Sequence, residues 1–387
     1  MKIAKNINRL GTETAFKVLA EANKLEKEGK EIIHLSLGQP DFKTANHIVE
    51  ATIKALKGGH HGYVLPNGII ECREAVSRKI KNLYKANINP DRILIIPGGK
   101  PTMYYAISLF GEPGAEIIYP DPGFPIYKSM IEYTGAKAVP LNLIESKDCS
   151  INPEKILSLI NNNTRLLIIN NPNNPTGNFT EKDKIDQLAE GLKKFPNVAI
   201  LSDEIYSRLI FDNKKMPTFF NYPDLYDRLI VLEGWSKTYS MTGWRLGWSV
   251  WPEQLIEHAI KFCVNNHSCV NAAIQYGGIA ALDGPEDELN NMLEKFSSRR
   301  KLIVEGLNSL KGVKCSLPGG AFYVFPNIKE TGMSGEEFAK KCLHKAGVAI
   351  VPGTSFGDFA TDYVRFSFAA SKENISKALE KIDKILK

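Results

Sequence analysis

Between residues 46 and 281, short β-branched runs alternate along the chain with longer segments of helical periodicity. This alternation is typical of βαβ units, which build a mostly parallel sheet covered by helices on both faces. Helices are predicted at residues 101–110 and 180–194, and Thr180 is expected to cap the second one. The clearest strands are predicted at residues 92–96, 115–119, 165–169, 198–202 and 229–232. We therefore predict a large, doubly wound α/β domain.

The pattern changes near residue 282. A long charged amphipathic helix is predicted at residues 287–310, followed by strand-like segments at 321–325 and 363–368 and by a lysine-rich C-terminal helix. The first 45 residues, with a helical segment at 15–27 and an extended one at 32–37, do not fit the central sheet. We expect residues 1–45 and 282–387 to form a smaller α+β domain beside a large domain of residues 46–281.

Composition excludes several classes of protein. The chain has 387 residues, 43% of them hydrophobic and 24% charged, as in ordinary globular proteins and unlike disordered ones. The net charge of +6 falls far short of the basic stripe that nucleic-acid binding needs. The sequence has no signal-like or membrane-spanning apolar run, and its six cysteines form no C-x-x-C pair. We expect a cytoplasmic protein that binds neither nucleic acid, nor membrane, nor metal.

Polar residues follow several predicted strands, at the edge where open parallel sheets bind ligands. Residues 92–96 are followed by Gly98-Gly99-Lys100 and a helix, a turn whose backbone N–H groups can hold a phosphate. Residues 165–169 are followed by a loop rich in asparagine and proline, which can aim amide groups rigidly. Taken alone, the glycine turn is better explained as an ordinary strand-to-helix turn, and the asparagine and proline loop is too common to indicate a site.

Asp203 and Lys237 follow two further strands. A carboxylate at a buried strand tip needs a cation, either a neighbouring arginine or a protonated ligand nitrogen. A partly desolvated lysine has a lowered pKa and can condense with an aldehyde. For any single lysine, the alternative is an ordinary surface residue. Because all four features fall at one edge of one sheet, we predict a single binding site there.

Three motifs resemble those of the pyridoxal-phosphate-dependent aminotransferases of fold type I, the class I/II or aspartate aminotransferase superfamily. They are Gly234-x-Ser236-Lys237 continuing through Gly243-x-Arg245-x-Gly247, Asn174-Pro175-Thr176-Gly177, and Asp203-x-x-Tyr206. The likeness extends over residues 36–367. It implies pyridoxal 5'-phosphate as the cofactor and transfer of an amino group between an L-amino acid and a 2-oxo acid by a ping-pong mechanism.

The resemblance also implies roles for the residues of the chemical step. Lys237 would form an aldimine with the cofactor and then carry the proton between the substrate α-carbon and the cofactor. Asp203 would pair with the pyridinium nitrogen, and Tyr206 and Asn174 would donate to the phenolic oxygen. Phe124 would stack on one face of the ring and Ile205 on the other.

For the phosphate, the resemblance implies contacts from Gly99 and Lys100 through the backbone, from Arg245, and from Ser236. Many relatives carry a serine three residues before the lysine, where this chain has Gly234, so the hydroxyl comes from Ser236 or is absent. Tyr63 resembles the tyrosine that reaches the phosphate of a neighbouring subunit. The resemblance therefore implies a homodimer with shared sites.

For the substrate, the resemblance implies that Arg365 binds the α-carboxylate with help from Gly38 and Asn174. Lys100 is similar to the lysine that meets a distal carboxylate in bacterial-type aspartate aminotransferases, and Thr14 matches a nearby polar contact. This favours aspartate as the donor. The alternative is that Lys100 only adds positive potential near a phosphate.

Other functions on the same scaffold stay open at this point. Relatives that act on alanine, aromatic amino acids or diaminopimelate-type compounds share the same catalytic residues. A β-lyase is also possible, because the same carbanion can eliminate a β-substituent and fold does not fix the reaction. A cofactor-binding transcription regulator is disfavoured, because the resemblance begins too early in the chain to leave room for a helix-turn-helix region.

Overall fold

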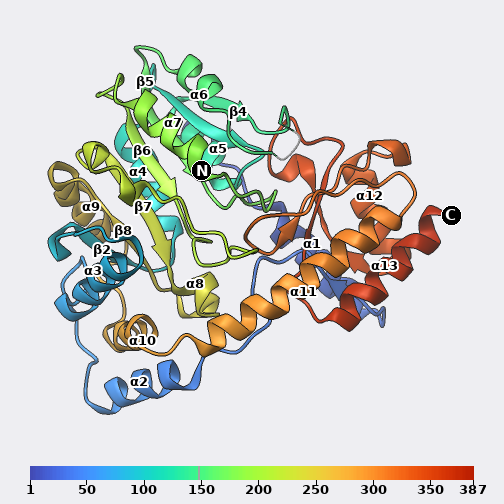
Figure 1. The fold of residues 1–387 in the computed structure, drawn as a ribbon, viewed down its shortest axis with the longest axis horizontal. Coiled ribbons are helices and arrows are strands. Elements are labelled where there is room, and N and C mark those ends of the chain that lie inside the picture. The colour runs from blue at the N-terminus through green and yellow to red at the C-terminus, as the bar shows by residue number, and fades with distance from the viewer. Residues whose placement is uncertain (147–148) are drawn as a thin grey trace.

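The computed structural model describes residues 1–146 and 149–387, and its central feature is a seven-stranded sheet (Figure 1). The strand order is β2-β8-β7-β6-β5-β3-β4, and only β8 runs antiparallel to its neighbours. The predicted mostly parallel α/β sheet is thus confirmed, with β4 and β8 as strands that the sequence pattern did not reveal. The strands are β2 (Ile93–Ile96), β3 (Glu116–Asp121), β4 (Lys137–Asn142), β5 (Thr164–Asn170), β6 (Ala199–Asp203), β7 (Leu229–Gly234) and β8 (Gly247–Val250).

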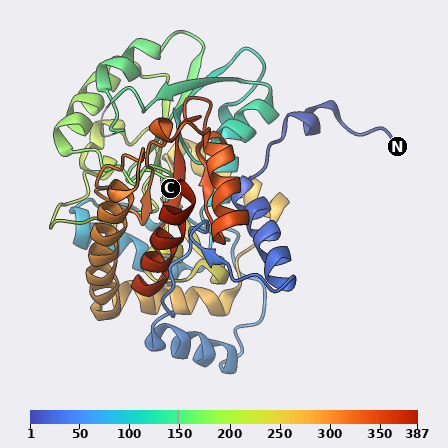
Figure 2. The ribbon, with the colours of Figure 1, turned by 90° about the vertical axis from the view of Figure 1, so that its right-hand side faces the viewer.

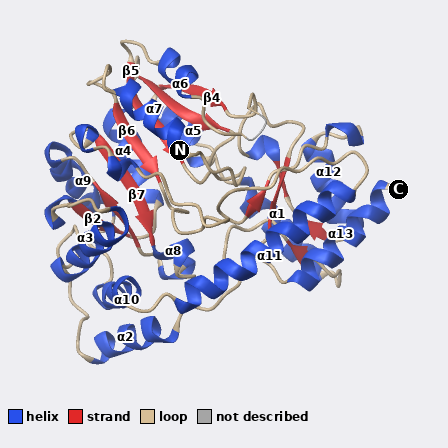
Figure 3. Ribbon diagram, viewed as in Figure 1, coloured by secondary structure: helices blue, strands red, loops and turns tan. Residues whose placement is uncertain are grey.

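Helices cover both faces of this sheet because successive strand residues are apolar on both sides (Figure 3). In β2, Ile93 and Ile95 pack against one helical layer, while Leu94 and Ile96 pack against the other. The first layer includes α3 (Ile70–Tyr84), α6 (Pro153–Leu159), α7 (Lys182–Leu192) and α10 (Ala272–Asp283). The second layer consists of α4 (Lys100–Phe110), α5 (Ile126–Thr134) and α9 (Glu253–Asn266).

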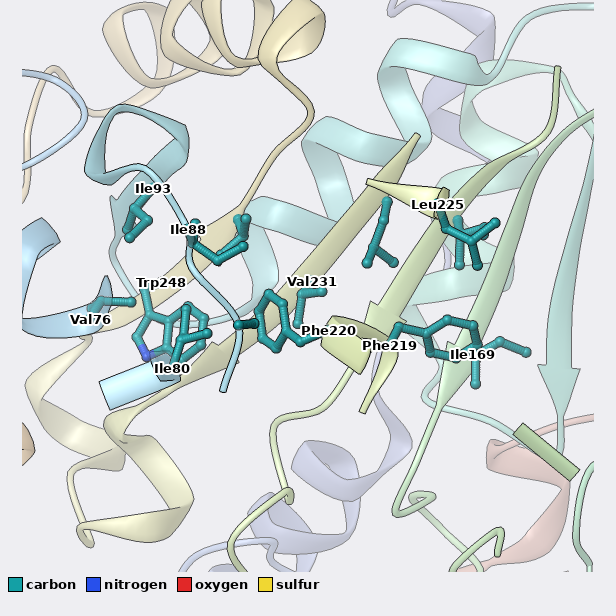
Figure 4. Close-up of a cluster of buried hydrophobic side chains, with 14 of the residues drawn as sticks. Val76, Ile80, Ile88, Ile93, Ile169, Phe219, Phe220, Leu225, Val231 and Trp248 are labelled. Atoms are coloured by element: carbon teal, nitrogen blue, oxygen red, sulfur yellow. The ribbon is translucent and has the colours of Figure 1, made fainter. Parts of the chain in front are cut away.

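The core beneath the first layer is built from branched aliphatic and aromatic side chains (Figure 4). Trp248 and Val231 of the sheet meet Ile80 of α3 and the turn that carries Phe219 and Phe220. Their burial is nearly complete, so this layer removes a large apolar area from water. The sheet is therefore a rigid base for the groups at its edge.

One predicted helix start is wrong. Helix α7 begins at Lys182 with Glu181 at the N-cap position, and Thr180 does not cap it. Thr180 is instead tied to the asparagine loop: its N–H donates to Asn171 Oδ1 at 2.9 Å, and its carbonyl accepts from Asn171 Nδ2 at 3.3 Å. The asparagine loop is buried, so its backbone polar groups cannot bond to water. Thr180 therefore bonds to this loop instead of capping helix α7.

A separate group of short strands and helices joins the N-terminal and C-terminal segments of the chain. Strand β1 (Ile33–His34) pairs in parallel with β10 (Val348–Ala349), and β11 (Val351–Pro352), β12 (Val364–Ser367) and β9 (Tyr323–Val324) form an antiparallel sheet. Helix α1 (Thr14–Lys27) packs through Ala22 and Leu25 on Leu343 and Ala349 (Figure 2). The expectation that the N-terminal segment packs with the C-terminal one is therefore met.

The remaining helices lie in the part formed by the N- and C-terminal segments and along the lower rim of the molecule in Figure 1. They are α2 (Asn46–Lys57), α8 (Trp235–Thr238), α11 (Asp287–Ser309), α12 (Gly335–Lys341) and α13 (Lys372–Leu386). The division of domains at residues 46 and 281 stays a prediction. None of the helices in the described ranges is both long and apolar enough to cross a membrane.

The sheet brings the polar segments to one edge. Strands β2, β5, β6 and β7 all end there, and the reversed strand β8 begins there, with Gly247 opposite both Ile96 and Gly234. Arg245 precedes β8 by two residues, so it lies at the same edge although its strand runs the other way. The turns after β2, β5, β6 and β7 thus meet the turn before β8.

Candidate active site

A cavity of about 600 Å³ lies at this edge, lined by residues of the sheet and of the N- and C-terminal segments. It brings together twelve of the predicted site residues: Gly38, Gly99, Lys100, Phe124, Asn174, Asp203, Ile205, Tyr206, Ser236, Lys237, Arg245 and Arg365. The predicted residue outside it is Tyr63, which is 92% exposed between α2 and α3. The side chains that the motifs singled out therefore share one space.

Lys237 lies on the single helical turn α8 that follows β7. Its Nζ donates a hydrogen bond to the carbonyl oxygen of Gly38 at 2.6 Å. Burial, together with the charges of Arg365 and Arg245, lowers the pKa of Lys237 to about 8. An amine with this pKa is neutral in a sizeable fraction of molecules near pH 8, which a nucleophile or general base requires.

Asp203 ends strand β6 and is buried. Its Oδ2 accepts from the Tyr127 hydroxyl at 2.5 Å, and its Oδ1 accepts from the Ile205 N–H at 3.2 Å. Burial raises the pKa of Asp203 to about 6. Among the described residues, no arginine or lysine forms an ion pair with this carboxyl group, so the alternative of a neighbouring arginine is wrong.

The next residue, Glu204, is used differently. Its Oε1 accepts from the Ser202 hydroxyl at 2.8 Å and from the Phe219 N–H at 3.1 Å, and the residue does not line the cavity. Glu204 therefore ties the core turn to the sheet. Of the two adjacent carboxyl groups, Asp203 is the one available to a ligand.

Arg365 enters the cavity from β12 and is buried. Its Nη1 donates to Asn174 Oδ1 at 2.9 Å and its Nη2 to the Ser36 carbonyl at 2.5 Å, while its guanidinium lies 4.5 Å from the centre of the Tyr323 ring and 4.6 Å from that of Phe356. Within the described part of the chain no carboxylate pairs with it, and its Nε has no hydrogen-bond partner. Among the described residues Arg365 therefore has no structural ion pair, and this buried cation has no anionic partner there.

Two tyrosines that line the cavity, Tyr206 and Tyr323, contact each other. The hydroxyls of Tyr206 and Tyr323 are 2.8 Å apart, and burial holds the pKa of Tyr206 well above its ordinary value. Tyr206 therefore stays a hydroxyl donor at physiological pH. Because the Asn174 amide accepts from Arg365 through its oxygen, its nitrogen remains the donor end of the group.

The turn from β2 into α4 is shaped by its contact with Arg245. Gly98 has φ +83°, and a Cβ there would collide with the Arg245 guanidinium. A Cβ on Gly234 would lie 2.9 Å from Gly247 Cα, because β7 and β8 approach closely at this edge. A side chain does not fit at position 234. Ser236 and Thr238, on either side of Lys237, are both buried, and of these two hydroxyls only that of Ser236 lines the cavity.

Sequence reasoning missed three residues of the cavity or its support. Tyr127 holds Asp203, Tyr323 holds Tyr206, and Glu13 forms an ion pair with Lys100. The spacing of Tyr127, three residues after Phe124, was a usable signal for a shared site. Tyr323 and Glu13 lie far from their partners in the sequence, and only the tertiary structure shows these contacts.

The comparisons with known proteins identify the family. The sequence matches aminotransferase class I and II over residues 30–382. The chain belongs to this aminotransferase family. It is 36% identical over 386 residues to the aspartate aminotransferase of Pyrococcus horikoshii, covering 99% of this chain and 97% of that protein. It is also 36% identical to the (5-formylfuran-3-yl)methyl phosphate transaminase of Methanocaldococcus jannaschii, over 95% of each chain.

The fold of this aminotransferase agrees with the same conclusion. The aspartate aminotransferase from Rhizobium meliloti superposes with a TM-score of 0.95 at 30% identity, covering all of this chain and 99% of that one. Fold type I and a pyridoxal-phosphate-dependent transaminase, as the motifs implied, are thereby confirmed. The roles of individual residues stay predictions.

The raised pKa of Asp203 predicts an effect on stability. We expect Asp203→Asn to raise the melting temperature of the cofactor-free aminotransferase, and to raise it more at pH 8 than at pH 5. The folded protein holds the Asp203 proton up to a pKa of about 6, against an ordinary value of 3.8. The carboxyl group thus favours folding below pH ~4 and loses that contribution as the pH rises through 6.

Thermal denaturation at the two pH values measures this difference. The exposed Asp227→Asn variant is the control and should show no such pH dependence. An Asp203→Asn variant that is equally or less stable than the wild type at pH 8 contradicts the expectation.

Proposed function

We propose that this aminotransferase binds pyridoxal 5'-phosphate at Lys237 and transfers an amino group from an L-amino acid, with aspartate as the first choice, to a 2-oxo acid such as 2-oxoglutarate. The observation that carries the proposal is the pairing of chemistries in one cavity. An amine of lowered pKa at Lys237 and a buried guanidinium without counter-ion at Arg365 both line it.

The residues present fit the cofactor. Asp203, a carboxyl group without an ion-pair partner in the described chain, suits a protonated ring nitrogen, and the donors Tyr206 and Asn174 suit the phenolic oxygen. Phe124 and Ile205 supply apolar surfaces for the two faces of a ring. The phosphate would be held by Gly99, Lys100, Ser236 and Arg245. When bound, pyridoxal phosphate supplies an aldehyde that condenses with amines and a ring that accepts electrons.

Lys237 performs the proton transfer in this proposal. With a substrate bound, its Nζ would be a free amine near the substrate α-carbon. The pKa of about 8 leaves a neutral fraction that can accept the α-proton and then return it. The Gly38 carbonyl, which accepts from Nζ, restrains this amine between the two tasks.

Arg365 holds the α-carboxylate, which the amino acid and the 2-oxo acid have in common. The planar guanidinium offers two parallel N–H groups to a carboxylate, and it lies within 4.6 Å of the centres of the Tyr323 and Phe356 rings. Binding an anion also relieves the cost of a buried cation without a counter-ion. Orientation of the substrate and stabilisation of the site therefore come from one contact.

Aspartate is supported by two findings. Lys100 lines the cavity and offers a cation to a distal carboxylate. Two of the similar proteins, the sequence relative from Pyrococcus horikoshii and the structure from Rhizobium meliloti, are named aspartate aminotransferases. The (5-formylfuran-3-yl)methyl phosphate transaminase of Methanocaldococcus jannaschii, at a similar identity, is named for a different substrate.

The test is a panel of amino donors with 2-oxoglutarate as acceptor, following the cofactor absorbance and the keto acid formed. Aspartate is expected to give the highest kcat/KM among aspartate, alanine, phenylalanine and diaminopimelate. Turnover confined to the other donors would remove the aspartate assignment. Keto acid and ammonia released without an acceptor would contradict the transaminase itself and favour a β-lyase.

Replacement of Arg365 tests carboxylate binding separately. Arg365→Ala is expected to raise KM for aspartate by about a hundredfold or more, because a buried charge-assisted bidentate contact is lost. The affinity for pyridoxal phosphate should change little, and Arg365→Lys should restore only part of the loss, since lysine lacks the planar fork. Equal loss of cofactor and substrate affinity in steady-state kinetics and cofactor titration would show a structural role.

A homodimer belongs to the same proposal. Tyr63 is almost fully exposed on the loop after α2, and apolar Ile53, Leu56, Leu65 and Ile70 near it are also exposed. Such a surface suits a second copy of the chain, whose cavity Tyr63 would reach. A monomer by sedimentation at micromolar concentration, with full activity, would contradict the shared site.

A further inference from the structure

The outer part of the cavity holds an ion pair that the aspartate assignment does not explain. Glu13 Oε1 pairs with Lys100 Nζ, and both residues line the cavity. The Glu13 side chain is only 15% exposed, and Lys100 is 45% exposed. Lys100 Nζ also lies 5.8 Å from the centre of the Phe16 ring and 5.5 Å from that of Phe124. Lys100, the cation proposed to bind a distal carboxylate of the substrate, is thus already paired with the carboxylate of Glu13.

Glu13 is not needed for helix formation. It occupies the N-cap position of α1, but its side chain accepts no hydrogen bond from the first turn. The preceding backbone is fixed elsewhere, since the Gly11 N–H donates to Ser129 Oγ at 2.9 Å. A serine, threonine, aspartate or asparagine would cap better than glutamate at this position. The carboxylate of Glu13 is thus directed to the cavity rather than to its own helix.

The charge of Glu13 acts on the catalytic groups as well. It opposes the lowering of the pKa of Lys237 and of Arg365, which shows that its field reaches both. The other wall of this outer region is apolar and contains Phe16, Leu19, Met103 and Phe124. The region therefore combines an exchangeable ion pair with an apolar surface.

An aminotransferase with a ping-pong mechanism must accept two substrates in one cavity. A free Lys100 suits a dicarboxylate, but it leaves an unpaired cation beside a neutral side chain. A permanently paired Lys100 suits neutral side chains but gives a distal carboxylate no partner. Partly exposed ion pairs are weak, so a substrate carboxylate can displace the Glu13 carboxylate from Lys100 at a small cost in free energy.

We propose that Glu13 is an exchangeable counter-ion that sets substrate specificity. It stays on Lys100 when the substrate side chain is neutral or aromatic, and it leaves when a distal carboxylate takes its place. The proposal rests on the proposed function, because it concerns the same cavity. It predicts an enzyme that accepts both substrate classes, with weaker binding of dicarboxylates than a free lysine would give.

Glu13→Gln tests the proposal in the dimeric holoenzyme. Dissociation constants are measured for two unreactive carboxylates, succinate and 3-phenylpropionate, from the change in cofactor absorbance. Removing the competing charge should tighten succinate binding about tenfold and weaken 3-phenylpropionate binding severalfold, so that their ratio changes by more than tenfold. The kcat/KM ratio of aspartate to phenylalanine should shift in the same direction.

Two variants control this experiment. Glu21→Gln removes a carboxylate on the same helix that pairs with His344 outside the cavity, and it should keep the wild-type ratio. Glu13→Asp keeps the charge and should keep most of the wild-type ratio of the two dissociation constants. If Glu13→Gln does not fold, Glu13→Asp is compared with Lys100→Met instead. In that comparison only Lys100→Met should lose succinate binding.

The outcomes separate this proposal from the one on which it rests. Parallel changes for both carboxylates, or an unchanged ratio in Glu13→Gln, would overturn the role of Glu13 while transamination continues. A holoenzyme that binds neither carboxylate and converts no amino donor would overturn the proposed function and this inference together.

Discussion

The site depends on burying charged groups without giving them charged partners. Lys237, Asp203 and Arg365 are all largely removed from water, and no described residue forms an ion pair with any of them. Burial is the largest cause that moves the pKa of each group toward the neutral form, down for the two cations and up for the acid. The fold stabilises this arrangement only partly, through hydrogen bonds with neutral groups: the two cations donate to oxygens, and the carboxyl group accepts from a hydroxyl and a backbone N–H. In the proposed function, a cofactor with a protonated ring nitrogen and a substrate with a carboxylate would complete it.

The rest of the molecule makes this burial possible. Apolar strands with helices on both faces provide a rigid sheet whose edge does not relax around the charges. The reversed strand β8 brings Arg245 to that edge, and β12 brings Arg365 from a separate sheet. The cavity therefore needs both parts of the chain. Movement of the terminal segments relative to the sheet would change access to Lys237 through Gly38, which the terminal part contributes.

Much of this arrangement could be predicted from the sequence, for local reasons. The five predicted strands of the seven-stranded sheet, β2, β3, β5, β6 and β7, are mainly apolar runs, and polar residues such as Asp203 and Lys237 at or after their ends break the pattern sharply. Strand β4 was missed because it is only partly buried and contains Pro140. Strand β8 was missed because its four residues include a glycine and a serine and so form no apolar run. Contacts such as Tyr323 with Tyr206 and Glu13 with Lys100 join distant segments. Neither periodicity nor a motif carries information about such pairs, so substrate preference is the least predictable property.

The most direct test of the account is the half-reaction of Lys237→Ala with aspartate, followed in a stopped-flow instrument by the absorbance of bound pyridoxal phosphate. If the buried amine moves the α-proton, the variant should still bind the cofactor while the rate falls by about 10²–10⁴-fold or more, the contribution of a positioned general base. A small primary amine added in solution should restore part of the rate. A Lys237→Ala variant that reacts within tenfold of the wild-type rate would contradict the account, because another group would then move the proton.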